Sequence, residues 1–151
     1  MLTPAWYLTD GDYFRELSQV PFDSAASAVS AVAHTFGDDA RYSPALTAAA
    51  TYIALLAVEH LNDEVTYNAR RHRAAELARL LHGLNFLHAH LTQTIQKLAE
   101  HADKRNLPGL ANLPATTIKT IIDSLCAAGA SGEVCAGHLK EAHLTLRSAT
   151  K

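Results

Sequence analysis

Residues 45–58 read ALTAAATYIALLAV, and only Thr47 and Thr51 interrupt this apolar run. Ser43 and Pro44 come directly before it, and serine at the N-cap followed by proline at the first helical position is typical of a helix start. A helix that is apolar on nearly every side needs neighbours on most of them. The run of 14 residues is shorter than the roughly 20 needed to cross a bilayer. The stretch therefore predicts a buried core helix.

A second long helix is predicted over residues 74–102, where large apolar residues recur every three or four positions. One extra step breaks strict heptad spacing, which favours the seam of a helical bundle over a long coiled coil. We name these positions the leucine stripe: Leu77, Leu80, Leu84, Leu87, Leu91, Ile95, Leu98 and Ala102.

The segment Arg70-Arg71-His72-Arg73 joins the two predicted helices and contains neither glycine nor proline. If residues 44–104 formed one helix, it would be about 90 Å long and would need other chains to cover it. We expect instead a turn near residues 68–73, so that the two long helices run antiparallel. The continuous rod is the alternative, and it would form a dimer.

The remaining segments predict shorter helices. Residues 1–22 suggest an arm and a short helix, and residues 103–114 contain two prolines and a glycine, which indicates a loop. Gly129 is expected to end a helix over residues 115–128, and Ser131 to start another that runs to Ser148. The predicted fold is all-α: an antiparallel helical bundle with two long central helices, two shorter C-terminal helices and N-terminal helical segments. We expect one domain over residues 1–151, with the bundle core at 23–148.

Composition narrows the possible functions. Of the 151 residues, 28 are alanine, which favours helices and close helix packing. The formal charge of −2 supplies no broad basic surface for nucleic acid. No cationic leader followed by a hydrophobic stretch is visible, so we expect a cytoplasmic protein without membrane contact. Two cysteines are too few for a secreted disulfide framework.

Motifs with a known catalytic mechanism are missing from the sequence: GxxxxGK[ST], GxSxG, HExxH and Glu-x-x-His. The leading interpretation is a non-catalytic interaction or regulatory module that associates with itself or binds another protein. Trp6 and Tyr7, in the N-terminal arm, are candidate partner-binding residues because these aromatics need a surface to cover.

A metal-dependent or ligand-binding helical enzyme is the second hypothesis. His60 and Glu64 are four residues apart on one helical face, and His82 would lie opposite His60 if the helices turn back near residue 71. Imidazole and carboxylate groups are ligands for divalent metals, so this triad is the candidate metal site. The simpler alternative is that His60 closes the apolar end of its helix and Glu64 faces solvent.

Cys126, Cys135 and His138 form a weaker candidate. A tight turn after Gly129 would bring them together, although a structural zinc site requires a fourth ligand. The favoured interpretation is that both cysteines are ordinary core residues, because free cysteine is often buried.

Nucleic-acid binding is the third hypothesis, and it depends on Arg70, Arg71 and Arg73. These side chains could contact phosphates, but the acidic Glu59 and Asp63 lie close before them in the sequence. Positive charge after a helix C-terminus is also expected from the helix dipole. The sequence therefore does not favour nucleic acid as a partner.

Overall fold

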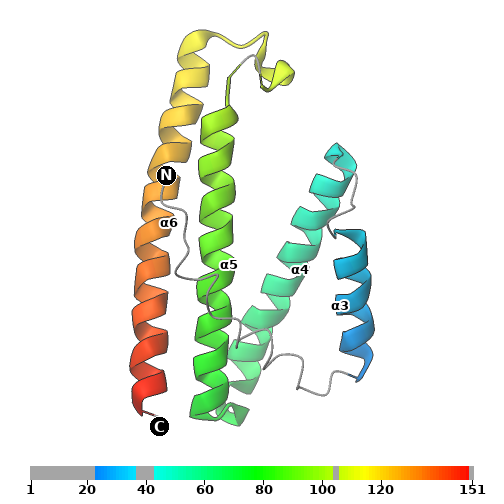
Figure 1. The fold of residues 1–151 in the computed structure, drawn as a ribbon, viewed down its shortest axis with the longest axis vertical. Helices are drawn as coiled ribbons and strands as arrows, with labels where there is room; N and C mark the ends of the chain where they lie inside the picture. Colours follow the sequence, from blue (N-terminus) through cyan, green and yellow to red (C-terminus); the bar gives the residue numbers. More distant parts are fainter. Residues whose placement is uncertain (1–22, 37–42, 104–105, 150–151) are drawn as a thin grey trace. The chain divides into compact units, whose positions relative to one another are not determined.

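The computed structural model describes residues 23–36, 43–103 and 106–149, and every regular element in these ranges is helical. The described residues fall into two compact units. One contains α3 (Asp23–Thr35), α4 (Pro44–Asn68) and the short 3₁₀ helix η1 (Ala69–Arg71). The other contains α5 (Ala74–His101), the 3₁₀ helix η2 (Pro108–Leu110) and α6 (Ala115–Ala149) (Figure 1). The all-α prediction is confirmed, and the expectation of a single domain stays a prediction.

α4 begins where the sequence indicates. The Ser43 side chain accepts a hydrogen bond from the backbone N–H of Leu46 at 3.1 Å, and Pro44 is the first helical residue. Further along, the hydroxyls of Thr47 and Thr51 donate to the carbonyls of the residues four positions earlier, at 3.1 and 2.9 Å. The two polar side chains within the apolar run are therefore satisfied inside the helix.

The helix breaks between residues 68 and 74, so the continuous rod over 44–104 is wrong. His72 and Arg73 have extended backbone angles, with ψ of 125° and 160°. The Glu76 carboxylate then accepts a hydrogen bond from the backbone N–H of Arg73 at 2.8 Å, which satisfies a free donor at the start of α5. The predicted interruption of the helix at 68–73 is confirmed, and the antiparallel arrangement of the two long helices stays a prediction.

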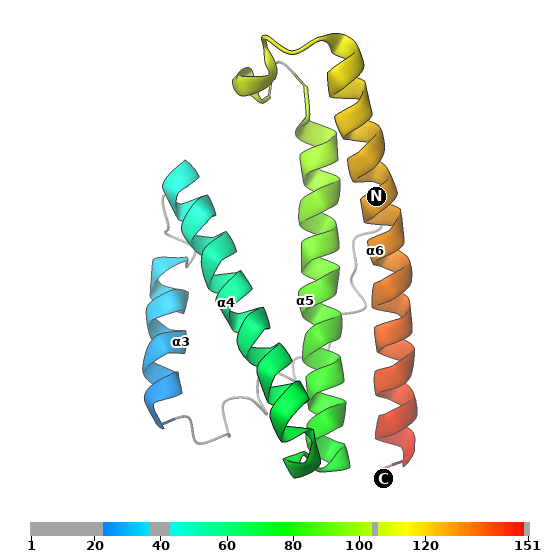
Figure 2. The same cartoon turned by 180° about the vertical axis from the view of Figure 1, so that it is seen from behind.

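The prediction that α4 is buried is not met, because no residue of α4 is buried. Leu55 is 53% exposed and Leu56 is 46% exposed, and Ile53 is only half-buried. Within its unit, α4 lies beside α3, which has only 13 residues (Figures 1 and 2). The apolar pattern indicates that a helix needs cover, but it does not identify the covering surface.

α5 and α6 form an antiparallel hairpin, joined by a connection that contains η2 (Figure 2). The α5 face against α6 is not the leucine stripe but a second row of residues with strict heptad spacing, roughly 120° away around the helix. We name this row the small stripe: Ala78, His82, Asn85, Ala89, Thr92, Gln96 and Ala99. Phe86 and Ala89 form a buried cluster with Ala136 of α6. The α5–α6 contact therefore does not use the leucine stripe, and the expectation that this stripe forms a bundle seam stays a prediction.

The two shorter C-terminal helices are also corrected, because α6 is one helix of 35 residues. Gly129 does not end a helix and Ser131 does not start one. Gly129 is buried, and a Cβ atom built on it would lie 2.9 Å from Cγ of Gln96. No described glycine has a positive φ. Glycine serves here for close helix packing rather than for helix termination.

The inward face of α6 keeps heptad spacing from end to end, and each of its members is buried or half-buried. Small residues in the middle of this row allow α5 to approach closely. The row consists of Ile118, Ile122, Leu125, Gly129, Gly132, Ala136, Leu139, His143 and Leu146.

Candidate functional site

Polar side chains cross the interface between α5 and α6. The Asn85 amide donates from Nδ2 to the backbone carbonyl of Ala136 at 2.5 Å, and Asn85 is 4% exposed. The Gln96 amide donates from Nε2 to Oε1 of Glu133 at 2.7 Å. These two bonds connect the helices at separate levels, so they restrict how far one helix can slide along the other.

Aromatic rings meet at the end of the hairpin where α5 begins. His82 stacks on Phe86 with ring centroids 4.7 Å apart and an interplanar angle of 18°. His143 of α6 meets the same His82 ring edge-on, at a centroid distance of 4.4 Å. The sequence singled out His82 as a metal ligand, but it did not indicate this contact with His143.

His143 is 7% exposed and its Nδ1 lies 2.8 Å from the backbone carbonyl of Ala78. A carbonyl oxygen only accepts, so Nδ1 carries the proton and Nε2 keeps a lone pair in the neutral ring. Nε2 of His143 is buried and has no hydrogen-bond partner in the part of the chain that the structure describes, and the same holds for Nε2 of His88. His143 thus joins the two helices through one nitrogen only.

The predicted metal ligands belong to different units. His60 is exposed on α4, and Glu64, one turn later, accepts a hydrogen bond from Nδ2 of Asn68 at 3.1 Å. His82 lies on α5, in the other unit. Among the described residues, no group of three or more His, Cys, Asp or Glu side chains is arranged to hold a metal ion. The triad of His60, Glu64 and His82 stays a prediction.

The second candidate cluster does not form, because α6 has no turn after Gly129. Cys126 and Cys135 lie nine residues apart on one helix, which places them on opposite faces and about 13 Å apart along the axis. Both are exposed, so the expectation of two core cysteines is wrong as well. His138 is also exposed, with Nδ1 3.9 Å from Oε2 of Glu141.

The predicted phosphate-contacting residues, Arg70, Arg71 and Arg73, are all exposed. Arg70 and Arg71 form the end of η1, after the C-terminus of α4, where cations are favourable. Nε of Arg73 lies 3.7 Å from Oε1 of Glu76, in an ion pair that solvent reaches. Nucleic-acid contact by these side chains stays a prediction. Trp6 and Tyr7 lie outside the described residues.

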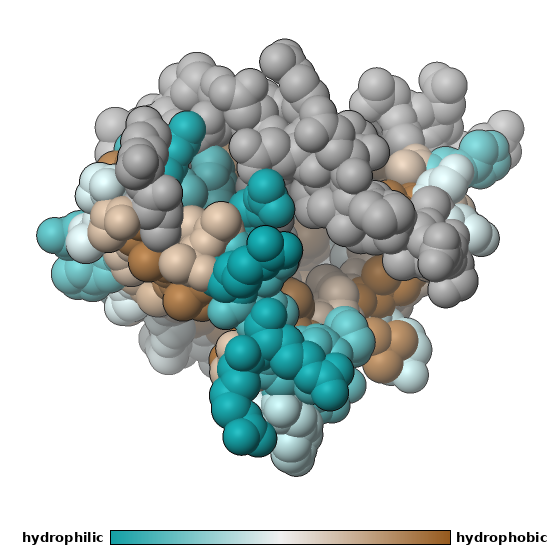
Figure 3. All heavy atoms as spheres, turned by 90° about the horizontal axis from the view of Figure 1, so that it is seen from below, coloured by the Kyte–Doolittle hydropathy of each residue, from teal (hydrophilic) through white to brown (hydrophobic). Residues whose placement is uncertain are grey.

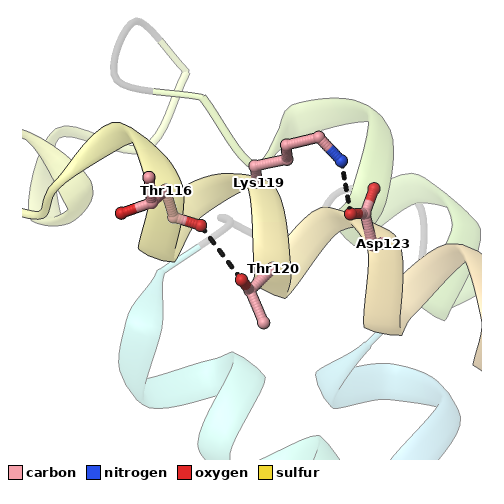
Figure 4. Close-up of polar contacts among 4 residues, drawn as sticks. All are labelled: Thr116, Lys119, Thr120 and Asp123. Carbon is pink, nitrogen blue, oxygen red and sulfur yellow. Dashed lines mark hydrogen bonds and ion pairs between the residues drawn. The ribbon is translucent and has the colours of Figure 1, made fainter.

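The outer face of α6 is polar near its start. Nζ of Lys119 lies 2.6 Å from Oδ2 of Asp123, and the Thr120 hydroxyl donates to the carbonyl of Thr116 at 3.0 Å (Figure 4). These residues are exposed, and their contacts stay within one or two helical turns. These exposed polar side chains are typical of a solvated helix surface.

Apolar side chains reach the surface elsewhere. Seen from the end where α4 passes into η1, hydrophobic atoms lie at the surface beside strongly polar ones (Figure 3). Among the described residues, the stretch Pro44–Arg71 is the one helix long and apolar enough to cross a membrane, and none of its apolar window is buried. On α5, Leu77, Leu91 and Leu98 of the leucine stripe are between 42% and 47% exposed.

No protein family, curated protein or solved structure matches this chain.

Proposed function

We propose that the chain is a non-catalytic helical interaction module that acts by associating with itself. The observation that carries this proposal is the lack of any buried residue in α4, although nearly all of residues 45–58 are apolar. Burying apolar surface contributes about 25 cal/mol per Å², so an uncovered apolar helix favours association. The antiparallel bundle predicted from the sequence is the proposed arrangement of the assembled helices.

The test is the mass of the native protein, measured by light scattering and sedimentation over a wide concentration range. The chain has a mass of 16.3 kDa, and we expect a discrete species of at least twice that value. Replacing Leu55 and Leu56 with glutamine tests whether the exposed side chains of α4 contribute to self-association. Glutamine is compatible with a helix, so the substitutions should leave α4 intact. A monomer at every concentration, with cooperative unfolding, would contradict the proposal.

A second candidate function is membrane association through α4. It is favoured by the length and apolar character of Pro44–Arg71 and by the absence of burial there. The hydroxyls of Thr47 and Thr51 also donate to backbone carbonyls of the preceding turn, so these donors need no hydrogen bond to water. Flotation with phosphatidylcholine vesicles distinguishes the two candidates: a membrane helix floats with the lipid at high salt, and a self-associating soluble module stays in the dense fraction.

A further inference from the structure

α6 packs on the small stripe of α5 and leaves part of the leucine stripe exposed, while Leu80, Leu84, Leu87 and Ile95 are half-buried. Leu91 and Leu98 are each 47% exposed, and Leu77 is 42% exposed. α5 thus carries two adjacent heptad-like rows, one of them already used within the hairpin. A helix with two such rows fits a bundle in which it has two helical neighbours. Unlike the apolar surface of α4, which surrounds the helix, this row lies on one face and defines a register.

The spacing of the stripe identifies a second copy of this chain as its occupant. Strict heptad spacing fails once, where Leu87, Leu91 and Ile95 are separated by two successive steps of four. Such an irregularity changes the local winding, so a partner helix packs well only if it has the same irregularity at the same level. A second copy supplies it. A helix with uninterrupted heptads does not.

The order of steps is also symmetric about Leu91. Moving away from it in either direction, the steps are four and three, through Leu87 to Leu84 on one side and through Ile95 to Leu98 on the other. An antiparallel copy with its two-fold axis at Leu91 therefore meets apolar residues at each level from Leu84 to Leu98, as a symmetric interface requires. Leu87 would face Ile95 of the second copy, and Leu84 would face Leu98.

Charge favours the antiparallel orientation over the parallel one. Arg70, Arg71 and Arg73 are all exposed at or just before the start of α5. In a parallel pair, the arginines of both copies would gather at the same end, where like charges repel. In an antiparallel pair they lie at opposite ends.

We propose that two copies of the chain associate through the leucine stripe of α5, in antiparallel orientation, with the two-fold axis at Leu91. This inference rests on the self-association proposed above and adds the surface and the register. The assembled product is a four-helix arrangement of two α5–α6 hairpins.

Disulfide trapping in the full-length chain tests the register. The background carries Cys126→Ser and Cys135→Ser, since both cysteines are exposed. Leu91→Cys should form a disulfide-linked dimer on mild oxidation, because the axis brings the two copies of that position together. Leu84→Cys and Leu98→Cys should each give little product alone, and the double variant L84C/L98C should cross-link efficiently. Val134→Cys, exposed on α6, is the matched control and should not cross-link.

Two measurements separate failure of this inference from failure of self-association. Leu91→Glu should shift the light-scattering mass from dimer to monomer without loss of helical circular dichroism. A native dimer that shows no cross-link at position 91 and tolerates L91E would overturn the leucine-stripe interface but keep self-association. Efficient cross-linking by L84C alone would overturn the antiparallel orientation. A native monomer would overturn both proposals.

Discussion

Thr92 of α5 packs so closely against Gly132 of α6 that a methyl group on the glycine would collide with the threonine side chain. Thr92 is 5% exposed, and its hydroxyl donates to the carbonyl of His88 at 2.8 Å. The side chain is therefore held on its own helix while Gly132 provides the space opposite. The two helices therefore approach closely at this pair, near the middle of the hairpin.

Replacing Gly132 with alanine should destabilise the protein by about 1–3 kcal/mol, because overpacking outweighs the better helix propensity of alanine. Urea unfolding followed by circular dichroism measures this free energy. Gly137→Ala is the matched control, since a Cβ there meets nothing within 4 Å on the same helix. The control should stabilise the helix by about 0.5–1 kcal/mol. Equal effects at both positions would contradict the close contact.

Asn85→Ala should lower the free energy of unfolding by about 1–2 kcal/mol, through loss of a buried hydrogen bond and of packed side-chain volume. The bond from Asn85 to the carbonyl of Ala136 is one of the polar contacts that fix the helix register. Chemical denaturation provides the measurement. Asn62→Ala, at an exposed position of α4, is the control and should change stability by less than about 0.5 kcal/mol.

His143→Ala should cost about 2–4 kcal/mol, because the buried ring packs on His82 and donates to the carbonyl of Ala78. The exposed His138, on the same helix, serves as the comparison. His138→Ala should have an effect below about 0.5 kcal/mol, since its contact with Glu141 is open to solvent. If both substitutions proved equally harmless in thermal and urea unfolding, the buried position of His143 would be refuted.

Both cysteines should react with a thiol reagent in the native protein, in a stoichiometry of two per chain, because both are exposed. Oxidation of dilute protein should give no disulfide between Cys126 and Cys135 within one chain. A disulfide needs Cα atoms roughly 4.4–6.8 Å apart, and a continuous α6 separates these by about 13 Å along its axis. An intrachain disulfide, detected by mass spectrometry, would mean that α6 is broken near Gly129.

The sequence was sufficient for the helix boundaries that depend on local chemistry. Ser43 and Pro44 mark the start of α4 by capping and by proline geometry. The two prolines and the glycine of residues 103–114 mark the connection after α5. Local signals failed at Gly129, because the same residue ends helices and allows them to pack closely. The unbroken heptad row from Ile118 to Leu146 was the signal for a continuous α6.

Packing was harder to predict than helix position. The leucine stripe attracts attention because its residues are large, but the α5–α6 contact uses alanine, threonine and asparagine in an equally regular row. Hydropathy alone does not reveal a row of this kind. The contact of His143 with His82 was missed for the same reason. His143 lies in the heptad row of α6 that packs on the small stripe, and hydropathy does not reveal that contact.

The unbroken rows on α5 and α6 restrict how a protein of this fold can vary in length. Inserting one residue between Ile118 and His143 would rotate everything beyond it by about 100° and turn half of the row toward solvent. Adding seven residues to each helix would preserve the contact. Changes of any other size are tolerable only in the connection around η2, so related chains should differ there or by whole heptads.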